Sequence, residues 1–140
     1  MTENAAPASA PHKFAAPSLT ASELLHWNDE TARRWQKLLT DHPQALDFPC
    51  DIYNTRDLRG VIRHLVAVEL RYSQRLSGEP VTAYEDVPDG AVDLLFSLHQ
   101  DAIGRYRKLI ADDTIAWDER LEFTTVSMGT QRAARRHILF

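Results

Sequence analysis

The histidines of this chain are the side chains best suited to metal or acid–base chemistry, because an imidazole changes charge near neutral pH and binds transition metals. There are six: His12, His26, His42, His64, His99 and His137. No two of them form an H-x-x-x-H pair, the spacing that puts two imidazoles on one face of a helix. A protein metal site needs three or four ligands, so no single segment of the chain specifies one.

His64 is the strongest candidate among them, and it lies in the helical run TRDLRGVIRHLVAVELRYSQRL beside the apolar stripe. A buried imidazole at this position needs a hydrogen bond, a water molecule or a metal as its partner. A structural histidine is the commoner case, and a metal ligand is the alternative. Glu69 lies near the same stripe, where we expect an ion pair with Arg71 or Arg75.

The other histidines are weaker candidates. His12 falls in an N-terminal tail and His42 at a helix end. We expect His26 to point away from the apolar stripe of its helix, and His99 to face outward or lie at a boundary. His137 follows two small alanines, so it can approach another helix.

Other catalytic patterns are weak or missing. The sequence has neither a glycine-rich phosphate loop nor a G-x-S-x-G elbow. Cys50 is the only cysteine, so an intrachain disulfide is excluded, and without an activating base we expect this thiol to be inert. Arg132, Arg135 and Arg136 form a basic cluster, which we interpret as a solvated face.

Composition narrows the class of protein. The 140 residues suit one domain, and their 44% hydrophobic content is near the globular average. A net charge of −4 argues against a nucleic-acid partner, and no apolar stretch approaches the length of a membrane span. A single cysteine favours a reducing, cytoplasmic setting. Residues 1–18 are rich in Ala, Pro and Ser and predict a disordered tail before a domain at residues 19–140.

Three amphipathic helices are predicted. The first begins at the capping box Thr20–Glu23 and ends before Pro43, and the second begins at Asn54 or Thr55 and ends at Gly78. The third starts near Pro88. Their apolar stripes consist of Leu24, Trp27, Asn28, Thr31, Trp35 and Leu38, then Leu58, Val61, Ile62, Leu65, Val68, Tyr72 and Leu76, and then Ala91, Leu94, Leu95, Leu98, Ala102, Tyr106 and Leu109.

The last part of the chain predicts a short extended segment over residues 121–127 and then a fourth helix. Gly129 interrupts the pattern, and Ser127 or Thr130 caps a helix that continues through Phe140. Four amphipathic helices indicate an all-α four-helix bundle. The linker EPVTAYEDVPDG is long enough to cross the bundle and leave the second and third helices parallel.

Three stretches together resemble the DinB/YfiT-like superfamily: LLHWNDETARRWQKLL, LRGVIRHLVAVELRYSQRLSG and LEFTTVSMGTQRAARRHILF. The resemblance covers residues 20–140. It implies a four-helix bundle of up-down-down-up topology, often dimeric, that holds zinc or nickel on three histidines. His64 matches the ligand of the second helix.

The other two ligands implied by the resemblance form an H-x-x-x-H pair on the fourth helix, about two turns beyond His137. This sequence departs from the family there. We expect RRHILF to correspond to the middle of the family's fourth helix. The last helix of this chain is then short, and its metal site is incomplete. His137 would take a ligand role only if the helix packs in a shifted register.

The resemblance implies a metal- and thiol-dependent enzyme of the transferase or hydrolase type, acting on a low-molecular-weight thiol, with His64 as one ligand. The alternative is a non-catalytic binding or dimerisation module without metal, linked to stress responses. A third possibility is a small-molecule carrier whose interior is lined by Trp27, Trp35, Tyr72 and Tyr106, although aromatic residues at this spacing are more often plain core. We expect a homodimer that binds neither nucleic acid nor membranes.

Overall fold

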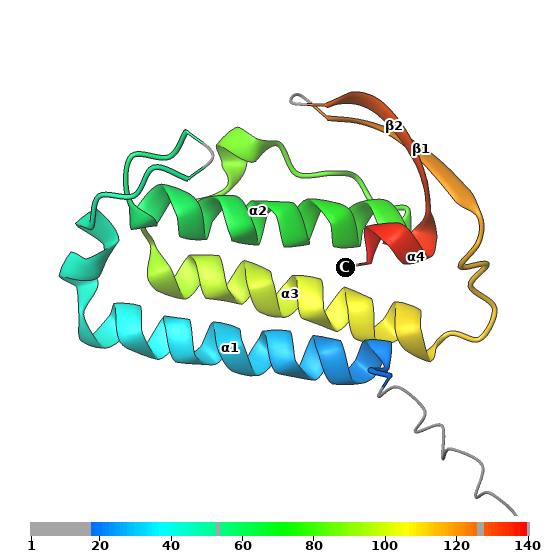
Figure 1. Ribbon diagram of the computed structural model, residues 1–140, viewed down its shortest axis with the longest axis horizontal. Coiled ribbons are helices and arrows are strands. Elements are labelled where there is room, and N and C mark those ends of the chain that lie inside the picture. Colours follow the sequence, from blue (N-terminus) through cyan, green and yellow to red (C-terminus); the bar gives the residue numbers. More distant parts are fainter. Residues whose placement is uncertain (1–17, 53, 126–127, 140) are drawn as a thin grey trace, which may run out of the picture.

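A computed structural model describes residues 18–52, 54–125 and 128–139. Its main elements are three long helices, α1 (Ala21–Asp41), α2 (Leu58–Ser77) and α3 (Val92–Ala111). Helix α3 lies between the other two and packs against both (Figure 1). Helices α2 and α3 run in the same direction and α1 runs opposite to them, as the long linker between α2 and α3 allows (Figure 1). Of the predicted tail, only Ser18 falls within the described residues.

The helix ends follow from local hydrogen bonds. The capping box of α1 is confirmed, since the Thr20 hydroxyl accepts from the Glu23 N–H and the Glu23 carboxylate accepts from the Thr20 N–H. Helix α2 is capped by Asp57, whose carboxylate accepts from the Gly60 N–H at 2.9 Å, and not by Asn54 or Thr55 as predicted. It ends at Gly78 as predicted, with φ of 70°.

The third helix begins later than predicted. Pro88 lies before it, and α3 starts at Val92 without a side-chain cap. The linker instead contains a short 3-10 turn, η2 (Tyr84–Asp86), and a second one, η1 (Pro43–Asp47), follows α1. Among the described residues, no helix combines the length and the apolar character needed to cross a membrane.

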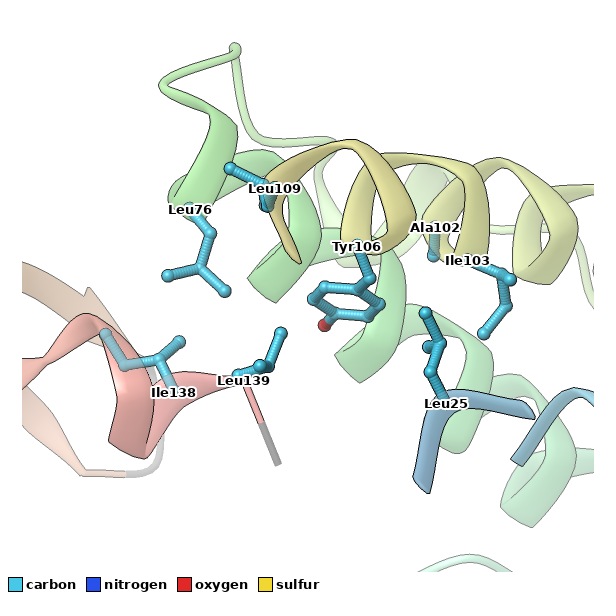
Figure 2. Packing of buried hydrophobic residues seen from close by; sticks show 8 residues of the cluster. All are labelled: Leu25, Leu76, Ala102, Ile103, Tyr106, Leu109, Ile138 and Leu139. Atoms are coloured by element: carbon cyan, nitrogen blue, oxygen red, sulfur yellow. The ribbon is translucent and has the colours of Figure 1, made fainter. Parts of the chain in front are cut away.

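The core consists of two apolar clusters along α3. One contains Leu39, Leu46, Ile62, Val66, Ala67, Val87, Leu95 and Phe96. The other contains Leu25, Leu76, Ala102, Ile103, Tyr106, Leu109, Ile138 and Leu139, whose side chains converge from α1, α2, α3 and the C-terminal segment (Figure 2). Both clusters take residues from several elements, so α3 can hold the domain together from the middle.

The predicted stripe of α1 is not its core face. Leu25, Asp29 and Leu39 are buried there, whereas Trp27 is 72% exposed and Leu38 43% exposed. Each residue turns a helix by 100°, so a stripe displaced by one position along the sequence faces a different neighbour. The face that carries the largest apolar side chains of α1 therefore does not pack on α3.

The predicted fourth helix is wrong over residues 129–134. These residues form a strand, β2 (Gly129–Ala134), that pairs antiparallel with β1 (Arg120–Thr125). The predicted extended segment over residues 121–127 is confirmed as far as Thr125, and residues 126–127 lie outside the described part. Pairing places Leu121 opposite Ala133, and both pack against the second core cluster.

Helical structure resumes only in α4 (Arg135–Ile138), a single turn. The hairpin is favoured over a helix in this segment because β1 pairs its backbone groups and because its inward side chains are partly buried. The described chain is thus mostly helical with a small two-stranded sheet.

Candidate functional site

Three helices bring polar side chains together in the interior. Asn28 and Asp29 come from α1, Glu69 from α2 and His99 from α3, and we call these four residues the polar cluster. Asn28 Nδ2 donates to Glu69 Oε1 at 2.7 Å, which links the two outer helices. Polar groups are rare in such a position unless they are paired, so the cluster specifies how the three helices align.

Asp29 is the most heavily bonded member of the cluster, although it is only 1% exposed. Its carboxylate accepts from Gln100 Nε2 at 2.7 Å, from Arg107 Nη2 at 2.7 Å and from Arg33 Nη2 at 2.9 Å. Burial by itself would raise the pKa of Asp29, but the hydrogen bonds from Gln100 and Arg107 and the charge of Arg33 outweigh it. The pKa of this carboxyl therefore lies below its ordinary value.

His99 lies between the two carboxylates and is 2% exposed. Its Nδ1 is 2.6 Å from Glu69 Oε2, and its Nε2 is 3.8 Å from Asp29 Oδ1. Nε2 is buried and has no hydrogen-bond partner. With a proton on Nδ1, the ring donates to Glu69 and fixes the orientation of that carboxylate.

A cavity of about 420 Å³ opens beside the polar cluster, at the end of the domain where the hairpin and α4 meet the helices. Its lining consists of Leu25, Asn28, Val68, Glu69, Tyr72, Tyr106, Phe123, Met128, Gln131, Ala133, His137, Ile138 and Leu139. The Tyr72 and Phe123 rings meet edge to face, with centroids 5.8 Å apart. Tyr106 is mostly buried and its hydroxyl donates to the Glu69 carbonyl oxygen at 3.1 Å. Burial, with a further contribution from the Glu69 charge, raises the pKa of Tyr106 far above its ordinary value, so the phenol stays protonated.

Glu69 is the charged group of this cavity that the structure holds most firmly. Its side chain remains 24% exposed, while each carboxylate oxygen has one protein partner. A carboxylate oxygen has two lone pairs, so each oxygen retains the capacity to accept a hydrogen bond from a molecule in the cavity. The arrangement offers a positioned anion at the edge of an apolar space.

His64, the predicted metal ligand, lies away from this cavity. It is half-buried on α2, and its ring is tilted against Tyr84 at a centroid distance of 6.3 Å. In the described part of the chain, no three His, Cys, Asp or Glu side chains are grouped so that they could hold a metal ion. The described residues of one chain therefore supply His64 as a single donor and do not fit a zinc or nickel site.

Other predicted residues were placed differently from expectation. His99 is buried, and Glu69 pairs with His99 and Asn28 instead of Arg71 or Arg75. Sequence reasoning missed Asp29 altogether. The available signal was position: Asp29 falls one turn after the buried Leu25, and His99 falls among the buried residues of α3.

Of the four aromatic residues predicted to line an interior, Tyr72 and Tyr106 do line the cavity. Trp27 and Trp35 do not, and they are 72% and 39% exposed. His137 lines the cavity from α4 although no ligand role was carried over to it. The aromatic part of the lining thus comes from α2, α3 and β1, which supplies Phe123, and not from α1.

Comparison with family models, with curated proteins and with solved structures found no match. The resemblance to the DinB/YfiT-like superfamily therefore stays a prediction, and the site is interpreted from its own chemistry.

The Asp29 carboxylate generates a prediction about stability. Because its pKa is lower in the folded than in the unfolded chain, its ionised form stabilises the fold above pH ~4 and this contribution is lost as the pH falls through the folded pKa. Asp29→Asn should lower the free energy of unfolding at pH 7 by about 2 kcal/mol, the usual value of a hydrogen bond to a charged group. Urea unfolding at several pH values checks this.

The difference between wild type and Asp29→Asn should shrink as the pH is lowered below ~4. Asp101→Asn, at an exposed position of α3, serves as the control and should change stability by less than ~0.5 kcal/mol. Equal effects of the two substitutions at pH 7 would contradict the role given to Asp29.

Proposed function

We propose that this chain binds a small molecule with an apolar body and a positively charged, hydrogen-bond-donating head, such as a primary amine. The observation that carries this proposal is the Glu69 carboxylate, held by Asn28 and His99 at the edge of a cavity with aromatic walls. Small-molecule sites typically combine such an apolar lining with a few placed polar groups.

The size and charge of the cavity support this ligand class. Its volume of about 420 Å³ is within the usual range for small-molecule sites. Glu69 contributes a negative charge, whereas the Asp29 charge behind it is already compensated by Arg33 and Arg107. An ammonium group donates three hydrogen bonds and suits the unused lone pairs of Glu69.

The proposal predicts a charge-dependent affinity. With 4-phenylbutylamine and the uncharged 4-phenylbutanol as probes, the amine should bind the wild-type chain about tenfold more tightly, which corresponds to about 1.4 kcal/mol. Glu69→Gln keeps the shape of the side chain and one acceptor oxygen but removes its charge, so this preference should disappear. Isothermal titration calorimetry measures both.

Glu85→Gln, at an exposed position outside the cavity, is the matched control and should retain the preference for the amine. The proposal fails if the amine and the alcohol bind wild type equally, or if Glu85→Gln and Glu69→Gln reduce the preference alike.

We further propose that the helices form a DinB-like four-helix bundle of up-down-down-up topology in which the side of α1 and α2 away from α3 is covered. Trp35 lies two helical turns after Asn28 and Leu38 almost three, and Leu65 lies one turn before Glu69. Val68 lines the same cavity as Asn28 and Glu69, so the four residues lie on the side of α1 and α2 on which Asn28 bonds Glu69. They are exposed by 39%, 43%, 54% and 36% respectively. We call these four residues the outer apolar face.

A second copy of the chain is the proposed partner of the outer apolar face, which makes dimerisation the alternative function. At one end of this side, α4 already packs Ile138 and Leu139 against Leu25 and Leu76 (Figures 1 and 2). Burying the remaining apolar surface contributes about 25 cal/mol per Å². Neighbouring apolar side chains that remain exposed are a feature of interaction surfaces.

Sedimentation velocity tests the dimer. The wild-type chain should dimerise with rising concentration, and the double substitution Leu38→Gln, Leu65→Gln should weaken the dimer at least tenfold, about 1.4 kcal/mol, because it removes two apolar contacts. Leu94→Gln, at a position of α3 that is 59% exposed, should leave the dimer unchanged. A wild-type monomer at all concentrations would contradict the proposal.

A further candidate function, besides ligand binding and dimerisation, is the metal- and thiol-dependent enzyme that the resemblance implies. The position of His64 favours it, because His64 lies one helical turn before Val68 on α2, and a helix covering the outer apolar face would bring further side chains near its imidazole. The described residues of one chain lack a complete set of metal ligands. The remaining donors would therefore have to come from residues other than these described residues.

Metal binding by His64 has a readout that does not depend on activity. If this candidate is correct, the wild-type protein binds about one zinc or nickel ion per chain in equilibrium dialysis, and absence of binding would eliminate it. His64→Ala should abolish this binding, and His26→Ala, at an exposed position of α1, should preserve it. Metal binding that survives His64→Ala would eliminate this candidate.

A further inference from the structure

A second cavity, of about 550 Å³, lies between α2 and β1 and is lined on its helical side by Arg71 and Arg75. We propose that this cavity binds a small phosphate-bearing molecule through the two guanidinium groups. The site is distinct from the Glu69 cavity and takes a ligand of opposite charge.

The two arginines differ from most others in the chain by their lack of a carboxylate partner. Arg33, Arg59, Arg105, Arg107, Arg135 and Arg136 each form an ion pair. Within the described ranges, no carboxylate lies within ion-pair distance of Arg71 or Arg75, and the Nε of Arg71 is buried without a hydrogen bond. A buried donor of this kind is costly unless a partner joins it.

Arg75 is held in place by aromatic rings instead. Its guanidinium lies 5.3 Å from the centroid of Tyr72 and 5.4 Å from that of Phe123. Burial, together with the charge of Arg71, lowers its pKa from the ordinary value, which indicates that positive charge is under-compensated here. Like charges four residues apart on a helix repel each other, and an anion between them would remove that repulsion.

Phosphate is the anion that this arrangement suits best. Guanidinium groups present planar pairs of N–H donors that match phosphate oxygens, and a phosphomonoester carries close to two negative charges near neutral pH. Thr82 and Thr124 also line the cavity and can add hydroxyl donors. The volume exceeds that of phosphate alone, so the ligand class is a phosphomonoester with a small organic group.

Two carboxylates line the cavity, and they differ in how much they oppose the binding of an anion. Glu79 is committed to Arg105, with Oε2 at 2.8 Å from Nε. Glu122 is on an exposed position of β1 and lines the cavity without an ion pair to either arginine. Its negative charge opposes an anion, so Glu122→Gln should strengthen phosphate binding.

Calorimetric titration of the full chain with phenyl phosphate, at constant ionic strength, tests the site. Arg71→Gln and Arg75→Gln should each weaken the binding of phenyl phosphate about tenfold, because each substitution removes one charge-assisted hydrogen bond. Arg34→Gln, at an exposed position of α1, should bind like wild type. Without ligand, Arg71→Gln should melt no lower than wild type because it relieves repulsion, which shows that the variant folds.

A second experiment distinguishes a soluble phosphomonoester from a lipid headgroup as the source of the phosphate group. Soluble phenyl phosphate should bind, whereas vesicles of phosphatidylcholine with phosphatidic acid should not sediment the protein. If the wild-type protein sediments with these vesicles and Arg71→Gln does not, the site binds a lipid headgroup instead of a small molecule, and the proposal is overturned. Equal affinity for phenyl phosphate in wild type, Arg71→Gln and Arg75→Gln, or no binding to wild type, would overturn it as well.

Discussion

The contact between the His99 imidazole and the Glu69 carboxylate is the interaction on which the arrangement of the three helices depends. At 2.6 Å it joins the central helix α3 to α2, and Asn28 carries the link on to α1. A polar contact in an apolar interior has few acceptable alternatives, because a rotated or displaced helix would leave the charged groups without partners. Apolar packing against α3 supplies most of the stability, and the polar cluster selects one register among the packings that the apolar residues allow.

The same cluster explains why a charged group can remain at the edge of a cavity. Asp29 is neutralised by Arg33 and Arg107, so its charge adds little to the cavity, and Glu69 is presented with both oxygens oriented. On the other side of Phe123, Arg71 and Arg75 present positive charge in a second cavity. Phe123 lines both cavities, and its ring is in edge contact with Tyr72 and next to the Arg75 guanidinium, so it separates these regions of opposite charge. The hairpin is therefore as important to both proposed sites as the helices, since β1 supplies Phe123.

Helices α1 and α2 each carry two apolar faces, and only one of them packs on α3. The residues of the outer apolar face, Trp35, Leu38, Leu65 and Val68, belong to the other face. A helix with two apolar faces suits a position in which it packs against two neighbours. The presence of two apolar faces also explains why the apolar stripe predicted for α1 differs from the face of α1 that is buried in the described structure.

The sequence by itself determined where the three long helices form, because capping residues, glycines and apolar spacing act locally. Thr20 and Gly78 set the predicted ends of α1 and α2. Only the tertiary structure decided which face is buried, because that depends on the neighbouring helix, and this is why His99 and Asp29 proved to be interior. Residues 129–134 became a strand for the same reason: their helical propensity is weaker than the backbone pairing and burial provided by β1. Glu69, His99 and Asp29 are 30 or more residues apart in sequence, so no local pattern indicates that they meet.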